Sequence, residues 1–277
     1  MARDTNFYYS FLVLTPARRQ AVVAVWDFCR AVDDAVDEAR VETEADRAAV
    51  HARLDEWRRE IARCFVAIDD PASAPQTPQG RALVPFIRQF DLPRGPFADL
   101  VDGVAMDIGH HRFKNFAELY QYCYRVASTV GIICVQIFGC EDAQSRDYAM
   151  DLGLALQLTN ILRDVKPDLE RGRVYLPLDD LRAHGCTVDD LAAGVVTEPV
   201  RQLIAFECRR ARDFYQRAKD ALPPGDRRRL VAAEIMRAVY FETLRRIERN
   251  GHDVFTARAR VPRPRQAIIA LRQWLLT

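Results

Sequence analysis

Apolar residues recur at intervals of three and four through most of this chain of 277 residues. Such spacing keeps returning to one side of an α-helix, because a helix advances about 100° per residue. No stretch alternates apolar and polar residues for long enough to indicate a β-strand. The sequence therefore predicts an all-α protein, with helices over residues 17–39, 43–67, 80–90, 95–110, 115–139, 143–166, 196–221, 226–250 and 263–276.

Two segments interrupt the helical pattern. Residues 69–80 are rich in Pro, Ala and Gln and predict a loop, and Pro223-Pro224-Gly225 predicts a turn between two helices. Similar amphipathic patterning resumes on both sides of each, so neither is expected to separate domains. With 49% hydrophobic residues the chain can bury one large core. We expect a single domain over residues 1–277.

Composition excludes several classes of function. The 40 basic and 39 acidic residues leave a net charge of +1, which gives no support to nucleic-acid binding. Seven scattered cysteines without a Cys-x-x-Cys pair predict neither a disulfide framework nor a zinc site. The longest apolar run, residues 126–139, is shorter than a membrane span, and the N-terminus lacks the apolar core of a signal peptide. We expect a cytoplasmic protein with reduced thiols.

The first acidic cluster places two carboxylates on one helical face. Asp33 and Asp37 are four residues apart, with Arg30 one turn before Asp33 and Trp26 one turn before Arg30. An apolar stripe over residues 22–36 runs beside them. Two like charges at this spacing cost a few tenths of a kcal/mol, roughly, in an isolated helix, and a bound cation reverses that cost. The pattern favours a polyanion that brings its own divalent cation, as a diphosphate does with Mg2+.

A second cluster repeats this logic later in the chain. Gln157, Asn160 and Asp164 follow one another at spacings of three and four, Arg163 adjoins Asp164, and Asp168 lies one turn further on. Amide and carboxylate oxygens both suit hard divalent cations. Two such helices facing each other would hold several metal ions between them.

Four segments, which together span nearly the whole chain, carry a set of motifs. The segments are Asn6-Phe-Tyr-Tyr-Ser-Phe through Phe28-Cys-Arg-Ala-Val-Asp-Asp-Ala-Val-Asp37, Tyr122-Cys-Tyr-Arg-Val-Ala-Ser-Thr-Val-Gly131, Leu156-Gln-Leu-Thr-Asn-Ile-Leu-Arg-Asp164 through Arg171-Gly-Arg-Val-Tyr-Leu-Pro177, and Tyr240 with Leu244 and Ile247. They resemble the squalene/phytoene synthase family. The order and separation of the motifs are specific to that family, because other prenyl-diphosphate enzymes usually carry Asp-Asp-x-x-Asp as their second motif.

The resemblance implies an isoprenoid-synthase helical bundle around a central apolar cavity. It also implies a prenyltransferase that joins two farnesyl diphosphates head to head into presqualene diphosphate, on the way to squalene and hopanoids. Mg2+, which Mn2+ could replace, and arginines would neutralise the leaving diphosphate, and the apolar cavity would keep water from the carbocation. No Gly-x-Gly-x-x-Gly follows a strand-like segment, so NADPH has no support, and a downstream squalene-forming enzyme could complete the route.

The family's functional residues transfer to this chain position by position. The resemblance assigns Mg2+ binding to Asp33, Asp37, Asn160, Asp164 and Asp168. Catalysis is assigned to the four aspartates with Tyr240. Substrate binding is assigned to Thr5, Asn6, Trp26, Arg30, Gln157, Arg163, Arg171, Arg173 and Tyr240.

Three departures from the family pattern bear on these assignments. Trp26 stands where most relatives have a tyrosine and cannot donate its hydroxyl. Thr5 and Asn6 replace serines that face the diphosphate in relatives. A lysine and Pro167 replace a commoner Gly-Glu pair before Asp168. Proline lacks the amide hydrogen and clashes with the preceding turn, so we expect the helix to end or kink here and to displace Asp168 from the face of Asp164.

Alternative functions remain open. Phytoene synthase, acting on geranylgeranyl diphosphate, and dehydrosqualene synthase share every acid named above; the run at residues 125–131 with Ile137-Phe-Gly139 favours the hopanoid-type presqualene enzyme. A non-catalytic assembly-factor scaffold is expected to lose its aspartates, whereas both pairs persist here. A terpene cyclase or chain-elongating enzyme is disfavoured by the second motif.

The C-terminal segment suggests a further contact. Residues 267–276 are amphipathic and follow Arg263 and Arg265. Such a helix either closes a helical core or lies on a membrane surface, here the inner face of the membrane.

Overall fold

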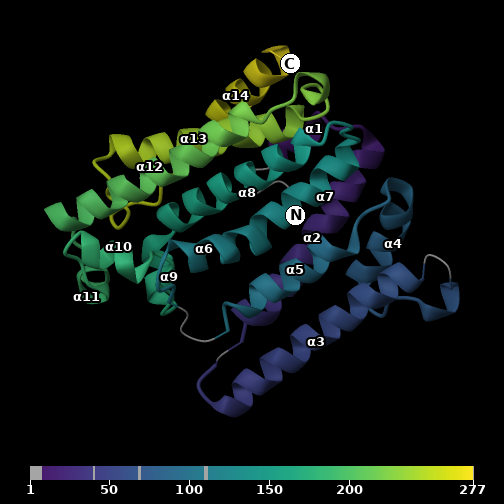
Figure 1. The fold of residues 1–277 in the computed structure, drawn as a ribbon, viewed down its shortest axis with the longest axis horizontal. Coiled ribbons are helices and arrows are strands. Elements are labelled where there is room, and N and C mark those ends of the chain that lie inside the picture. The colour runs from purple at the N-terminus through teal and green to yellow at the C-terminus, as the bar shows by residue number, and fades with distance from the viewer. Residues whose placement is uncertain (1–7, 40, 68–69, 109–111, 277) are drawn as a thin grey trace.

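The computed structural model describes residues 8–39, 41–67, 70–108 and 112–276. Within these ranges every regular element is helical, and one isolated parallel bridge joins Arg112 to Val174. The predicted all-α class is confirmed (Figure 1). The elements are α1 (Tyr8–Leu12), α2 (Pro16–Asp37), α3 (Glu44–Val66), η2 (Pro71–Ser73), α4 (Pro78–Phe90), α5 (Arg94–Ala105), α6 (Phe116–Cys123), η3 (Tyr124–Ser128), α7 (Thr129–Phe138), α8 (Gln144–Arg163), α9 (Val165–Glu170), α10 (Leu178–Ala183), α11 (Val188–Ala192), α12 (Glu198–Asp220), η4 (Pro224–Asp226), α13 (Val231–Arg249) and α14 (Arg263–Leu276).

Helix α8 organises the packing. It contacts α12 and α13 on one side and α7 with η3 on the other, while α2 packs against α3, α4, α5 and α7. Figure 1 shows α12 and α13 running along one side of α8, with α3 at the opposite edge of the molecule. A continuous set of buried apolar side chains extends from α2 to α13. The two predicted acidic helices, α2 and α8, therefore belong to one packed core.

Small residues allow unusually close contacts along α8. A Cβ atom placed on Gly153 would lie 2.6 Å from the Cα of Ser128, and one on Gly131 would lie 2.8 Å from the carbonyl oxygen of Ala149. The hydroxyl of Ser128 donates to the carbonyl of Met150 at 2.7 Å. Ser128 ends η3, a π-helical segment that joins α6 to α7 within the predicted helix 115–139. The small residues thus admit a neighbouring helix.

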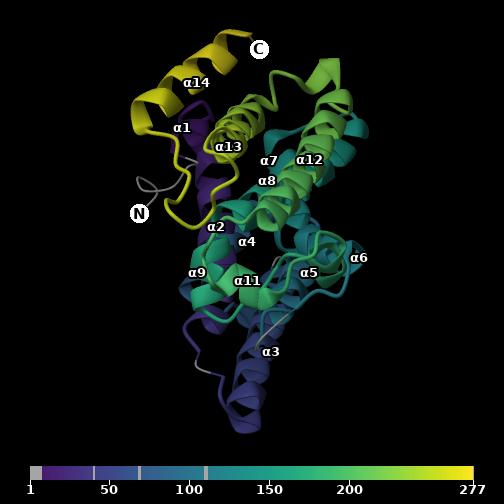
Figure 2. The ribbon, with the colours of Figure 1, turned by 90° about the vertical axis from the view of Figure 1, so that its left-hand side faces the viewer.

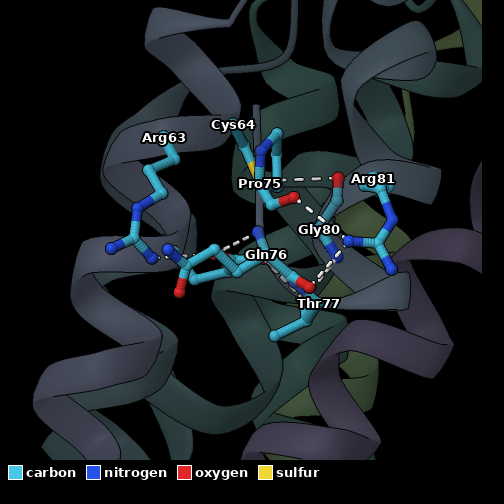
Figure 3. A network of polar contacts seen from close by, with 8 residues as sticks. Arg63, Cys64, Pro75, Gln76, Thr77, Gly80 and Arg81 are labelled. Atoms are coloured by element: carbon cyan, nitrogen blue, oxygen red, sulfur yellow. Dashed lines mark hydrogen bonds and ion pairs between the residues drawn. The ribbon is translucent and has the colours of Figure 1, made fainter. Parts of the chain in front are cut away.

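The loop between α3 and α4 is fastened by a buried carboxylate. Glu60, which is 2% exposed, accepts hydrogen bonds from the backbone amides of Gln76 at 3.0 Å and Thr77 at 2.6 Å. The Thr77 hydroxyl adds a bond of 2.7 Å to Glu60, and Arg63 one of 3.2 Å. Figure 3 shows this network between the helices, with Gly80 close by. The predicted loop 69–80 ends early, because Thr77 caps α4 and Pro78 begins it.

The predicted helix 143–166 is two helices. α8 ends at Arg163 and α9 begins at Val165, with Asp164 between them at φ −110° and ψ 15°. Pro167 accounts for the break, because it has no amide hydrogen for the carbonyl of Arg163 and its ring clashes with that turn. The expected helix end is therefore confirmed. The short helices α1, α9, α10 and α11 were not predicted separately, since five or six residues carry too little periodicity.

No helix in the described part of the chain is long and apolar enough to cross a membrane.

Candidate active site

Asp33 and Asp37 lie in the last turns of α2. The buried side of this helix is apolar and includes Phe28 and Val32, so the acids are turned away from the core. The C-terminal end of a helix carries partial negative charge from its unpaired carbonyls. Two carboxylates at that end are electrostatically unfavourable unless cations accompany them.

Arginines from a distant turn supply part of that positive charge. Arg173 Nη1 lies 2.6 Å from Oδ1 of Asp37, and Arg171 Nη1 lies 3.5 Å from Oδ2. Arg173 is 14% exposed and Arg171 is 63% exposed. Gly172 between them adopts φ +75°, which turns the chain back after α9 toward α2. Both predicted arginines thus contact the first acidic cluster.

The carboxyl of Asp33 is perturbed. Its pKa rises to about 7 because the surrounding protein removes hydration, and the negative charges of Asp37 and Asp107 add to the rise; Arg173 opposes it. The side chain still reaches solvent. Asp33 is therefore an accessible carboxyl among other acids, and a cation bound there would displace its proton.

Asp168, in α9, behaves in the same way. Burial and the charge of Asp164 raise its pKa to about 7, while Arg173 and Arg171 oppose the rise. Its backbone amide donates to the carbonyl of Asp164 at 3.0 Å. Asp168 therefore lies one turn after Asp164 and within electrostatic reach of it. Arg173 interacts with acids of both clusters, namely Asp33, Asp37 and Asp168, and also with Asp107.

Asp164 is held by two arginines. Arg163 Nε donates to Oδ1 at 3.0 Å, and Arg258 donates from Nε to Oδ1 at 2.6 Å and from Nη2 to Oδ2 at 2.8 Å. Burial opposes ionisation, yet these hydrogen bonds keep the pKa of Asp164 below its usual value. Arg163 also interacts with Tyr240, which is 4% exposed. Tyr240 is therefore a neighbour of Arg163, and its role stays a prediction.

A buried amide oxygen without a hydrogen-bond partner indicates that the site suits a metal ion. Asn160 Nδ2 donates to Gln157 Oε1 at 3.3 Å, while Asn160 Oδ1 is buried without a hydrogen-bond partner. Such an orphaned carbonyl oxygen is costly unless something binds it. It lies one turn before Asp164, and amide and carboxylate oxygens are the donors that Mg2+ prefers. The residues present therefore fit a hard divalent cation.

The protein alone does not complete such a site. Among the described residues, no three His, Cys, Asp or Glu side chains gather closely enough to hold a metal ion. The acids instead stand on separate elements, α2 on one side and the junction of α8 and α9 on the other. A cation between them would need further oxygens, which a diphosphate can supply.

Comparison with known proteins identifies the family of the chain. The family model for squalene/phytoene synthase matches residues 1–265. The chain belongs to the squalene/phytoene synthase family. Two curated relatives are a 15-cis-phytoene synthase of Synechococcus elongatus, 36% identical over 93% of this chain and 84% of the relative, and a phytoene synthase of Arthrospira platensis, 38% identical over 93% and 84%.

Solved structures of this family share the fold. A squalene synthase from Alicyclobacillus acidocaldarius superposes with a TM-score of 0.75 at 31% identity, covering 90% of each chain. A dehydrosqualene synthase superposes with a TM-score of 0.81, covering 99% of this chain and 92% of the other. At 24% identity the latter supports the helical fold alone. The family consists of prenyltransferase-type isoprenoid synthases, so the chain is assigned as an enzyme of that class.

One buried acid of the site was not predicted from the sequence. Asp107, just beyond α5, is 6% exposed and accepts hydrogen bonds of 2.8 Å from the hydroxyls of Tyr122 and Tyr175. Burial raises its pKa, while Arg173 and the two tyrosines oppose the rise. Asp107 has no acidic partner at helical spacing, so only the residues that surround it in the folded chain identify it as part of the site. Arg258 was missed for the same reason.

Two further residues predicted to bind substrate, Arg30 and Trp26, lie on α2. Arg30 is exposed and its Nε lies 3.8 Å from Oδ2 of Asp34, one turn further along the helix. Trp26 is half-buried on the same helix. Thr5 and Asn6 fall outside the described residues.

Proposed function

We propose that this family member joins two allylic prenyl diphosphates head to head, with loss of one diphosphate and one proton from the first condensation. The observation that carries the proposal is that Arg173 interacts with acids of both clusters, Asp37 on α2 and Asp168 on α9, while the orphaned oxygen of Asn160 lies one turn before Asp164. Acids without cations would be unstable in this arrangement. A diphosphate with its divalent ions satisfies both sets of charges.

Each residue has a specific role in this proposal. Asp33 and Asp37 would bind the cations from α2. Asn160, Asp164 and Asp168 would bind them from the other side, with Gln157 supporting Asn160. Mg2+, or Mn2+ in its place, neutralises the leaving diphosphate when bound.

The arginines would complete the neutralisation. Arg163, Arg173 and Arg258 already contact the acids that would hold the cations, so their guanidinium groups are placed for the diphosphate oxygens. Arg171 and Arg30 stand at the exposed margin and would meet the substrate on entry. Tyr240 would hold Arg163 in position from the buried side.

The reacting chains need an apolar space beside the acids. Cys29 lies one turn before Asp33 on α2, which packs against α7 where Cys134 lies. Burial raises both thiol pKa values, that of Cys134 to about 12, although part of each side chain remains accessible. We infer that the prenyl chains lie along the apolar contact between α2 and α7, where water would not quench a carbocation.

The length of the prenyl chain distinguishes two candidate reactions. The curated relatives bear the name phytoene synthase, which favours two geranylgeranyl diphosphates as substrates over the farnesyl diphosphate expected from residues 125–139. The farnesyl reaction, giving presqualene diphosphate, is the second candidate, because the structural neighbour from Alicyclobacillus acidocaldarius is a squalene synthase at 31% identity.

Product analysis separates these candidates. The purified chain is incubated with Mg2+ and either farnesyl or geranylgeranyl diphosphate, without and with NADPH, and the products are identified by mass spectrometry before and after phosphatase treatment. Phytoene from the C20 substrate supports the first candidate. Presqualene alcohol from the C15 substrate supports the second, and squalene appearing only with NADPH would make the chain a complete squalene synthase. No condensed product from either substrate would favour a non-catalytic scaffold.

We also propose a cytoplasmic location with access to the inner face of the membrane. The substrates carry long hydrocarbon chains and the products are more lipidic still. A membrane-bound enzyme that consumes the product would then act downstream.

A further inference from the structure

The C-terminal helix α14 has two different faces. Gln266 and Ala270 are buried against the body of the protein, where α14 packs on α13 and α1. Gln266 also donates to the carbonyl of Val261 at 2.9 Å, which fixes the start of the helix. Figure 2 shows α14 lying across α13 and α1 at one end of the molecule, with its other side turned outward. This outward face is the surface of interest.

The outward face is apolar. Ile268 and Leu271 are each 57% exposed and Leu275 is 70% exposed. Their spacing of three and four places them in one line along the helix, roughly opposite Gln266 and Ala270. Among the described residues, eight large apolar side chains are strongly exposed, and five of them belong to α14, including Trp274 and Leu276. Apolar exposure is thus concentrated on one element, which is typical of a binding surface.

The same segment is strongly basic. Residues 254–277 contain five arginines and no acidic residue, in a chain whose net charge is only +1. Arg260, Arg263, Arg265 and Arg272 are all exposed. Arg265 and Arg272 are seven residues apart and therefore flank the apolar line on the same side. The face joins an apolar stripe to a row of positive charges.

We propose that α14 docks on an anionic phospholipid membrane, with Ile268, Leu271 and Leu275 entering the acyl boundary and Arg265 and Arg272 contacting lipid phosphates. Helices with an apolar stripe, flanking arginines and a tryptophan lie in this way at the headgroup layer. A second copy of the chain is a poorer occupant, because pairing two such faces would bring two sets of arginines together. The surface that binds α14 must therefore carry the negative charge that these arginines attract.

The docking surface connects directly to the candidate active site. Arg258, which binds Asp164, lies in the same segment that leads into α14. An enzyme bound through α14 would thus hold this end of its site near the bilayer that dissolves its substrates and products. This inference deepens the membrane contact proposed above, but it does not depend on the length of the prenyl chain.

Vesicle binding by the whole chain tests the proposal without substrate. The protein is sedimented with vesicles of phosphatidylcholine alone and of phosphatidylcholine mixed with phosphatidylglycerol. We expect binding to the mixed vesicles only, with a blue shift of tryptophan fluorescence that Trp274→Phe removes. Each arginine near an anionic surface increases the partition coefficient onto the membrane about fivefold. The double variant Arg265→Gln with Arg272→Gln should therefore bind about 25-fold more weakly.

A matched pair of apolar variants checks the face itself. Ile268→Asp with Leu275→Asp should abolish binding to the mixed vesicles, and Val195→Asp should leave it unchanged, because Val195 is 58% exposed on a remote loop. All these sites are exposed, so circular dichroism and product formation in detergent should match those of the wild type. Equal binding to both vesicle types, undiminished binding of the Ile268→Asp and Leu275→Asp variant, or dimerisation through this face without vesicle binding would overturn the proposal. A wild-type chain that binds mixed vesicles but forms no condensed product would contradict only the proposed reaction.

Discussion

Arg258 forms a two-point ion pair with Asp164, from Nε to Oδ1 at 2.6 Å and from Nη2 to Oδ2 at 2.8 Å, across 94 residues of chain. The guanidinium occupies both oxygens that the proposal assigns to a metal ion. Arginine and Mg2+ therefore compete for Asp164 until a diphosphate provides oxygens for both.

This competition predicts opposite effects on two ligands in Arg258→Gln. The variant should bind Mg2+ alone more tightly than the wild type, because one competing cation is gone. It should bind pyrophosphate with Mg2+ more weakly, by about tenfold, because one positive partner of the anion is lost. Isothermal titration with each ligand measures both changes. Weaker binding of Mg2+ alone would mean that the pair organises Asp164 rather than competes for it.

Asp107 should be a structural support of the site. Asp107→Asn removes a buried charge that accepts from Tyr122 and Tyr175 and lies near Arg173. Hydrogen bonds to charged groups contribute about 1.5 to 3 kcal/mol, so the free energy of unfolding should fall by about that amount. Urea unfolding measures it, and Tyr175→Phe, which removes one hydrogen bond and no charge, should cost about 1 kcal/mol. Equal losses in the two variants would argue against a role for the charge.

Gly153 should tolerate no side chain. In Gly153→Ala the new methyl group would lie 2.6 Å from the Cα and 2.7 Å from the amide nitrogen of Ser128, and backbone cannot move aside cheaply. We expect a loss of about 1 to 3 kcal/mol in the free energy of unfolding. Gly95→Ala is the matched control, because nothing lies within 4 Å of its Cβ position in α5. That variant should be neutral or gain up to about 1 kcal/mol from helix propensity. Similar thermal melts for the two variants would contradict the close packing.

Glu60 should stabilise the protein in a pH-dependent way. Burial disfavours its charge, but hydrogen bonds from the amides of Gln76 and Thr77 outweigh this and lower its pKa below the ordinary value of 4.5. A carboxyl with a lowered folded pKa stabilises above its unfolded pKa, and that contribution is lost as the pH falls through the folded pKa.

Glu60→Gln should therefore cost about 2 kcal/mol at pH 7 and progressively less below about pH 4.5. Chemical unfolding across this range measures the difference between the variant and the wild type. Glu56→Gln, at an exposed position on the same helix, should have no effect at any of these pH values. A deficit that stays constant down to pH 3 would mean that the charge of Glu60 is not what fastens the loop.

The long helices could be predicted from the sequence because they depend on local spacing, and so do the two acidic clusters of the candidate site. Asp33 with Asp37, and Asn160 with Asp164, share helical faces that periodicity reveals directly. Pro167 likewise identified the break between α8 and α9, since its effect is confined to one turn. The single domain over residues 1–277 stays a prediction.

The features that the sequence did not predict depend on contacts between distant segments. Asp107 becomes part of the site only when Tyr122 and Tyr175 close around it, and Arg258 reaches Asp164 only after α13 has packed on α8. Neither residue has a partner at helical spacing. The preference for a farnesyl substrate rested on residues 125–139, which the structure uses largely for close contact between η3, α7 and α8. Residues selected for packing carry little information about the length of a substrate.

The central claim is that acids on α2 and at the junction of α8 and α9 jointly hold a metal-bound diphosphate. The most direct measurement compares Asp33→Asn, Asp164→Asn and Asp34→Asn by thermal unfolding with Mg2+ and pyrophosphate, added separately and together, alongside product formation. Asp34 is the matched control, because it adjoins Asp33 and pairs with Arg30 but is assigned no cation. We predict that Mg2+ and pyrophosphate together raise the unfolding temperature of the wild type and of Asp34→Asn. Asp33→Asn and Asp164→Asn should lose this shift. Their turnover should fall at least about 100-fold, which corresponds to about 2.7 kcal/mol in activation free energy. Retention of the shift and of turnover by either Asp33→Asn or Asp164→Asn would contradict the claim.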